Sequence, residues 1–98
     1  MTVLTLQSTL RPHDDVVVRE LDGEAVMLNL ASGIYFGLDQ VGTRIWFLIE
    51  QHGHLDLVLE SLGEEYDASV ETLAQDLLRL SSELVDKGLL VALGASGV

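Results

Sequence analysis

The chain has 98 residues, enough for one domain around a single hydrophobic core. Its 48% hydrophobic residues and one proline favour a folded protein, while the net charge of −11 opposes nucleic-acid binding, which depends on Lys and Arg. Cysteine is absent, and no apolar run approaches the roughly 18 residues of a membrane span. Composition therefore predicts a cytoplasmic domain that binds neither nucleic acid nor membrane and whose acidic surface suits a basic partner.

Three antiparallel strands are predicted in the first half of the chain. Residues 1–12 form either a loose N-terminal arm or a preliminary strand. The β-branched run 16–21 predicts the first strand, and the Asp22-Gly23 turn after it predicts a type I′ hairpin. Residues 24–30 and 34–37 predict the second and third strands. In the second strand the alternation places Val26, Leu28 and Leu30 on one face, and Met27 and Asn29 on the other.

Three helices are predicted to follow the strands. Asp39 is a good N-cap for residues 40–51, and residues 55–65 carry a second apolar stripe. A long helix then runs from a cap at Asp67 or Ser69 to Asp86 or Lys87, and residues 89–93 add a strand or pack on the helices. The order predicts an α+β, winged-helix-like fold (β-β-β-α-α-α) in residues 13–93, with 94–98 as a flexible tail.

No group of residues predicts catalysis. The sequence has no Cys nucleophile, no glycine-rich phosphate loop and no GxSxG motif. His52, His54 and Asp56 are too few for a metal site and are better explained as a turn between helices. Arg44 is expected to pair with a nearby carboxylate. We therefore predict that the chain is not an enzyme and holds no metal or cofactor.

The third strand predicts a binding surface. It enters a helix almost at once, so it is expected to be the last strand, and neither charge, proline nor a bulge protects its outer edge. Such an edge can accept a peptide as an added strand, with the long helix as one wall and its acidic residues holding Lys or Arg of the peptide. The candidate residues are Ile34, Tyr35, Phe36 and Gly37 on the strand, and Leu73, Asp76, Leu77, Leu80, Glu83 and Leu84 on the helix. The alternative is that the aromatic residues fill the core and the leucines pack on the other helices.

These residues also resemble a known family. The chain is similar to PqqD-like RiPP recognition elements, in particular the small stand-alone form encoded with lasso-peptide maturation enzymes. The resemblance covers roughly residues 10–93. Its most specific part, Tyr35 to Trp46 (YFGLDQVGTRIW), matches aromatic residues followed by L-(N/D)-x-(V/T)-(G/A)-x-x-(I/V)-W. Weaker support comes from Leu62 to Asp67 (LGEEYD), the Leu-rich helix and Gly88-Leu89-Leu90.

The resemblance implies a three-stranded sheet with three helices, and an adaptor without catalytic activity. Such an adaptor binds the leader segment of a ribosomally made precursor peptide on the third strand, against the third helix. It presents the leader to a separate leader peptidase, with a cyclase as a further partner. By position, the strand surface corresponds to Ile34, Tyr35 and Phe36, and the helix wall to the stripe from Leu73 to Leu84. Salt is expected to weaken binding to a basic leader.

Two other functions compete with this hypothesis. A winged-helix DNA-binding regulator has a compatible fold, but its reading helix would carry Glu71, Asp76, Glu83 and Asp86 against only Arg79 and Lys87. A scaffold module would instead pair the open edge with its own copy, so that the chain is a monomer or a weak dimer.

Overall fold

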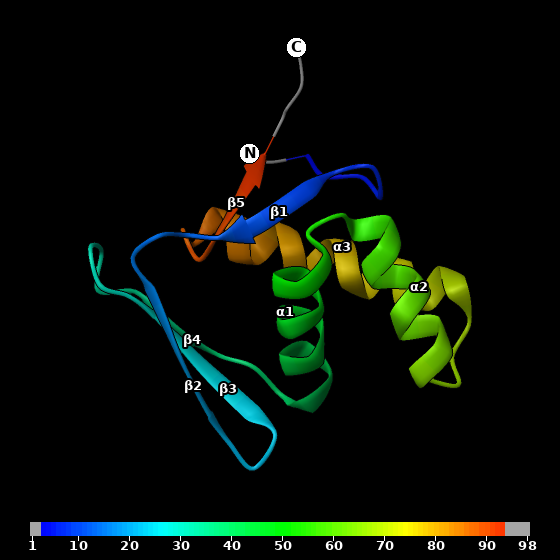
Figure 1. Cartoon of the computed structure of the whole chain (residues 1–98), viewed down its shortest axis with the longest axis horizontal. Helices are drawn as coiled ribbons and strands as arrows, with labels where there is room; N and C mark the ends of the chain where they lie inside the picture. Colours follow the sequence, from blue (N-terminus) through cyan, green and yellow to red (C-terminus); the bar gives the residue numbers. More distant parts are fainter. Residues whose placement is uncertain (1–2, 94–98) are drawn as a thin grey trace.

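The structure is a computed structural model that describes residues 3–93 (Figure 1). Its elements, in chain order, are β1 (Thr9–Pro12), β2 (Val16–Leu21), β3 (Glu24–Asn29), β4 (Tyr35–Gly37), α1 (Gln40–His52), α2 (Leu55–Glu65), α3 (Val70–Asp86) and β5 (Leu90–Leu93). The predicted α+β fold, a three-stranded antiparallel sheet followed by three helices, is confirmed. The tail predicted at 94–98 lies outside the described residues. Within them, none of the helices has the length and apolar character needed to cross a membrane.

Strands β2, β3 and β4 form the main sheet in that order. Arg19 pairs with Val26 between β2 and β3, and Met27 pairs with Phe36 between β3 and β4. The hairpin turn between β2 and β3 has positive φ at both central residues, 56° at Asp22 and 82° at Gly23, as a type I′ turn requires. The meander therefore forms as the sequence predicts, and it extends away from α1 in Figure 1.

A second, two-stranded sheet joins the two ends of the described chain. Strand β1 pairs antiparallel with β5, with Thr9 opposite Leu93 and Pro12 opposite Leu90. The segment before residue 13 thus contains a strand, one of the two possibilities that the sequence left open. Leu10 in this strand is only 1% exposed and belongs to the hydrophobic core, so the folded part of the chain begins before residue 13.

The helices supply most of the core. Each begins with a side chain that accepts a hydrogen bond from its first turn: Asp39 for α1, His54 for α2 and Ser69 for α3. The leucines Leu73, Leu77, Leu80 and Leu84 form the buried stripe of α3, and Trp46 of α1 is fully buried. Gly53, with φ of 75°, ends α1 by donating its N–H to Ile49.

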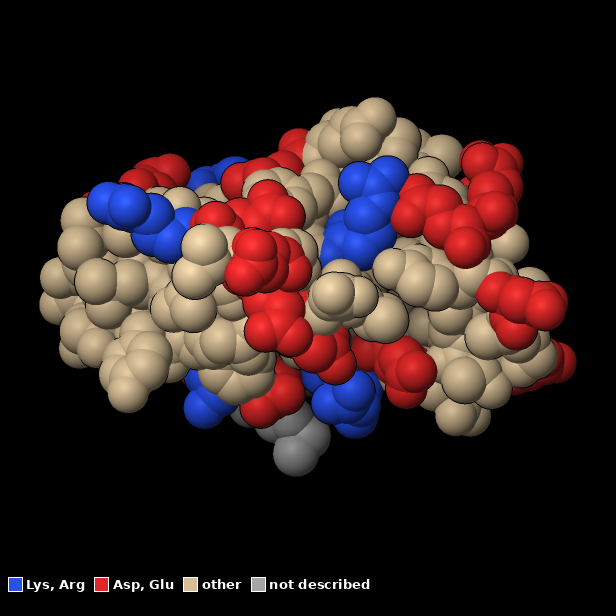
Figure 2. All heavy atoms as spheres, turned by 90° about the horizontal axis from the view of Figure 1, so that it is seen from below, with Lys and Arg blue, Asp and Glu red and all other residues tan. Residues whose placement is uncertain are grey.

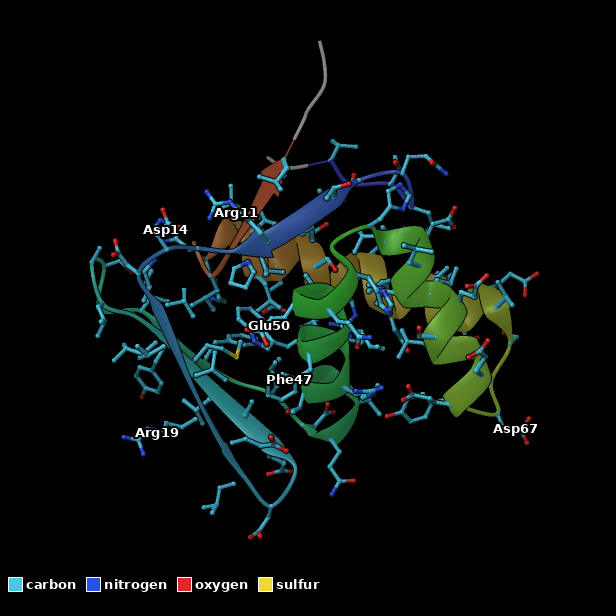
Figure 3. All side chains as sticks on the ribbon, in the orientation of Figure 1. Arg11, Asp14, Arg19, Phe47, Glu50 and Asp67 are labelled. Carbon is cyan, nitrogen blue, oxygen red and sulfur yellow. The ribbon has the colours of Figure 1, made fainter. Side chains whose placement is uncertain are left out.

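Strand β3 has the predicted alternation, and its inward face is the less apolar one. Ala25, Met27 and Asn29 are buried, whereas Val26 and Leu30 are exposed. The outer face of the sheet also carries Val17, Arg19, Leu21 and Tyr35, and Figure 3 shows Arg19 pointing away from α1. The helices therefore cover only one face of this sheet.

Candidate functional site

The free edge of β4 is the first part of the candidate site. Ile34 accepts a backbone hydrogen bond from Asn29 at 2.9 Å, and Leu38 donates one to Ala25 at 2.8 Å. Because backbone groups alternate between the two sides of a strand, Phe36 also bonds toward β3, while the N–H and C=O groups of Tyr35 and Gly37 point to the opposite edge. In the sheet, β4 has a partner on one side only. The prediction of an unpaired last strand is thus confirmed.

A groove of about 380 Å³ lies beside this edge. One wall is β4 and the segment after it, another is the start of α1, and the third is α3. Its lining residues are Phe36, Gly37, Leu38, Asp39, Val41, Gly42, Ile45, Asp76, Arg79, Leu80 and Glu83. The groove therefore combines an apolar lining with three charged side chains of α3.

The hydroxyl of Thr43 holds the sheet against α1 at one end of the groove. It accepts a hydrogen bond from the backbone N–H of Ala25 at 2.8 Å and lies 3.5 Å from the carbonyl oxygen of Leu38, to which it donates. Ala25 and Leu38 are opposite each other at the point where the chain leaves the sheet. The hydroxyl lies between the N–H of Ala25 and the C=O of Leu38, in place of the direct backbone bond between them. Thr43 is only 3% exposed, so this contact is shielded from water.

Asn29 anchors the other end. Its side-chain N–H₂ donates to the carbonyl of Gly88, immediately after α3, at 2.8 Å. Its side-chain oxygen accepts from the backbone N–H groups of Ala31 and Ser32 in the turn before β4. One buried side chain therefore connects the start of β4 with the C-terminal end of α3, the two walls of the groove.

Lys87 and Phe36 make a further contact between these walls. The ammonium group of Lys87 lies 5.6 Å from the centre of the Phe36 ring, within the range of a cation–π interaction. Phe36 itself lines the groove and is half-buried. Its ring is therefore held between the core and the end of α3.

The structure brings together half of the residues predicted for the site. Phe36, Gly37, Asp76, Leu80 and Glu83 all line the groove. Ile34 and Tyr35 do not line it: Ile34 is exposed before β4, and the Tyr35 side chain, 74% exposed, points to the outer face of the sheet. On α3, Leu73, Leu77 and Leu84 are buried in the core behind the wall, as the alternative interpretation of the stripe expects.

Sequence reasoning missed six of the residues that line the groove. Two of them, Leu38 and Asp39, lie between β4 and α1. Val41, Gly42 and Ile45 come from the start of α1, and Arg79 comes from α3. The helical spacing of Val41 and Ile45 after the Asp39 cap was a usable signal, because it placed both on one face. Arg79 lies one helical turn from both Asp76 and Glu83, which also placed it on their flank.

The polar groups considered for other chemistry have structural roles. His54 caps α2 by accepting from the N–H of Asp56, and within residues 3–93 no cluster of His, Asp and Glu is arranged to hold a metal ion. Arg44 makes a bidentate ion pair with Glu65, at 2.8 and 2.7 Å. The hydrogen bonds from Arg44 lower the pKa of the Glu65 carboxyl from its ordinary value, and the pKa of Arg44 is raised by the same bonds.

The comparisons with known proteins agree with this geometry. A family described as coenzyme PQQ synthesis protein D (PqqD) matches residues 24–90. The chain belongs to this family, as a PqqD-like recognition element. The matched residues include every groove-lining position found in the structure.

Two solved structures share the fold. One, described as TbiB1 in complex with the TbiA(beta) leader peptide, is 34% identical, with a TM-score of 0.78 over 89% of this chain and 99% of that one. The other, described as lasso peptide synthetase B1 complexed with the leader peptide, is 22% identical, with a TM-score of 0.76 over 85% of this chain and 98% of that one. A comparison with curated protein sequences gives no match.

Proposed function

We propose that this chain binds the leader segment of a ribosomally synthesised precursor peptide. The leader adds a strand to the free edge of β4 and lies in the groove against α3. The observation that carries the proposal is the position of this edge: Tyr35 and Gly37 direct unpaired backbone groups outward beside a groove lined by apolar and charged side chains. A peptide strand satisfies those groups and buries alternate side chains in the groove. The 34%-identical TbiB1, described in complex with a leader peptide, supports the binding of a leader by this chain.

The chain then acts as a non-catalytic adaptor. It presents the bound leader to a separate leader peptidase or another maturation enzyme, such as a cyclase, and raises the leader's effective concentration there. We place this activity in the cytoplasm, where ribosomal precursors are made, and expect a monomer or a weak dimer. Among residues 3–93, those that line the groove include no nucleophile paired with a base. We therefore assign the cleavage or modification of the precursor to the partner enzyme.

The test is a calorimetric titration with the leader of the precursor peptide encoded beside this gene. We expect saturable binding that Tyr35→Pro abolishes, because proline removes the outward N–H of Tyr35 without breaking a bond to β3. The matched control is Tyr35→Ala, which removes the exposed side chain and keeps the N–H; it should retain binding. A leader that binds the proline variant as tightly as the parent would overturn strand addition.

Self-pairing of the β4 edge is the competing use of this surface, and the same experiment separates the two. Sedimentation of the free chain over a range of concentrations should show a monomer that the leader does not change. Dimerisation that Tyr35→Pro abolishes and the leader cannot reverse would favour the scaffold function instead.

A further inference from the structure

The wall that α3 presents to the groove carries charges of both signs. Asp76, Arg79 and Glu83 line the groove beside β4. A second hollow of about 600 Å³ shares Arg79 and Glu83 and extends to Asp86 and Lys87. Along this flank the order is therefore acidic at 76, basic at 79, acidic at 83 and 86, and basic at 87, just after the helix ends. This differs from the purely acidic rim of Asp76 and Glu83 that the sequence suggested.

These charges are not paired with one another. Asp76 and Arg79 are three residues apart and Arg79 and Glu83 four apart, the spacings at which helical ion pairs form. The ion pairs that the structure contains within residues 3–93 are instead Arg11–Asp14 and Arg44–Glu65. The Arg79 and Glu83 side chains thus face the groove without an ionic partner, available to charges on a bound peptide.

The spacing of these charges matches that of side chains on a strand. Four residues of helix advance about 6 Å, from Arg79 to Glu83. Side chains on one face of a strand are two residues apart, about 6.6–6.8 Å. A peptide strand that runs along α3 in the groove would therefore place consecutive groove-facing side chains beside Arg79 and Glu83. Farther along, Lys87 already contacts the Phe36 ring.

We infer that Arg79 and Glu83 set the register of the leader by recognising an acidic and a basic side chain two residues apart. The inference rests on the proposed binding of a leader strand and specifies which peptides that site accepts. A slip of one residue turns both peptide charges away from the groove, and a slip of two opposes each wall charge with a wrong or absent partner. A peptide with the matching charge order is attracted by Arg79 and Glu83, whereas the reverse order brings like charges together at a cost in free energy. The two residues therefore select among peptides as well as attract them.

The net charge of the molecule cannot provide this discrimination. Acidic side chains form a broad band across the face shown in Figure 2, and the chain carries −11 in total. Such a field attracts any basic peptide and speeds its association, whatever its sequence. The negative field repels an acidic residue of the peptide, so binding of such a residue requires a local contact with Arg79. Selection of an acidic residue would therefore show that the α3 wall, rather than the net charge, is the source of specificity.

The test exchanges the two wall charges in the double variant Arg79→Glu/Glu83→Arg, which leaves the net charge unchanged. A phage-displayed library of random peptides, about 12 residues long or twice a typical strand, is selected on the parent and on this variant. Parent-selected peptides should share an acidic and a basic residue two positions apart, and the variant should select the reverse order. Peptides from the parent should bind the variant about tenfold more weakly, since each exposed pair contributes modestly and two are reversed.

The matched control is a second double variant that exchanges an acidic and a basic residue outside the groove. The double variant Arg44→Glu/Glu65→Arg transposes the bidentate pair of α1 and α2, neither member of which lines the groove. It should select the same peptides as the parent. Circular dichroism and thermal melting establish that each variant is folded.

Two results would overturn the inference, and they differ from failure of the proposed function. If both proteins select the same charge order, or peptides without charged pairs, while Tyr35→Pro still abolishes binding, the peptide adds a strand but Arg79 and Glu83 do not set its register. If the selected peptides bind Tyr35→Pro unchanged, or no peptide is selected by either protein, strand addition itself is wrong and the inference falls with it.

Discussion

The side-chain amide of Asn29 donates a hydrogen bond to the carbonyl oxygen of Gly88 at 2.8 Å, joining residues that are 59 positions apart in the chain. The bond connects the turn before β4 with the end of α3. At the other end of the groove the hydroxyl of Thr43 in α1 accepts from the N–H of Ala25 in β3. The two bonds together hold the sheet against the helices that line the groove.

Asn29→Asp should weaken this connection selectively. The carboxylate still accepts from Ala31 and Ser32, but it cannot donate to Gly88 and instead opposes an acceptor with a charge. We expect the free energy of unfolding to fall by about 1–3 kcal/mol in urea denaturation, and leader affinity to fall as well. Asn29→Ala loses all three bonds and should be less stable than Asn29→Asp. An Asn29→Asp variant as stable as the parent would show that the bond to Gly88 contributes nothing.

Thr43→Val should destabilise the protein although it conserves shape. Valine leaves the buried N–H of Ala25 without an acceptor, which we expect to cost about 1–3 kcal/mol of unfolding free energy. Thr43→Ser keeps the hydroxyl and loses one methyl group, about 0.8 kcal/mol. Denaturation of the three proteins side by side tests the bond, and equal stabilities of the Val and Ser variants would contradict it.

The Arg44–Glu65 ion pair should make a small, pH-dependent contribution to stability. Because folding lowers the pKa of Glu65, the contribution is present above its ordinary value of 4.5 and is lost as the pH falls through the lowered folded-state value. Both side chains are partly exposed, so we expect Glu65→Gln to cost no more than about 1 kcal/mol at neutral pH. The difference from the parent should shrink as the pH falls below 4.5 and in high salt. If it persists at acid pH, packing rather than charge is responsible.

Trp46→Phe should be far less damaging than Trp46→Ala. Trp46 is fully buried, and its indole N–H has no hydrogen-bond partner, so the parent already bears the cost of burying that group. Phenylalanine removes the unpaired N–H and fills most of the space, whereas alanine should cost about 3–5 kcal/mol. Thermal unfolding of both variants gives the comparison. Similar large losses for both would indicate that the N–H is satisfied by a buried water.

The local features of this protein followed from short stretches of sequence. Asp22-Gly23 predicted the type I′ turn, Asp39 predicted the start of α1, and the unprotected run before it predicted the free edge of β4. Each depends on backbone preferences or caps within a few residues, and such interactions act before the chain is folded. The apolar periodicity likewise predicted α2 and α3, and of the two caps that the sequence offered for α3 the structure has Ser69.

Only the tertiary structure decided which of these surfaces meet. Alternation in β3 separated two faces, but packing against the helices chose the face of Met27 and Asn29 as the inner one. The stripe of α3 predicted an apolar wall, yet the core takes Leu77 and Leu84 and leaves Leu80 with the charged flank to the groove. Helical and strand periods specify which residues share a face. Which face is buried depends on partners distant in the sequence, here brought together by the contacts of Thr43 with Ala25 and of Asn29 with Gly88.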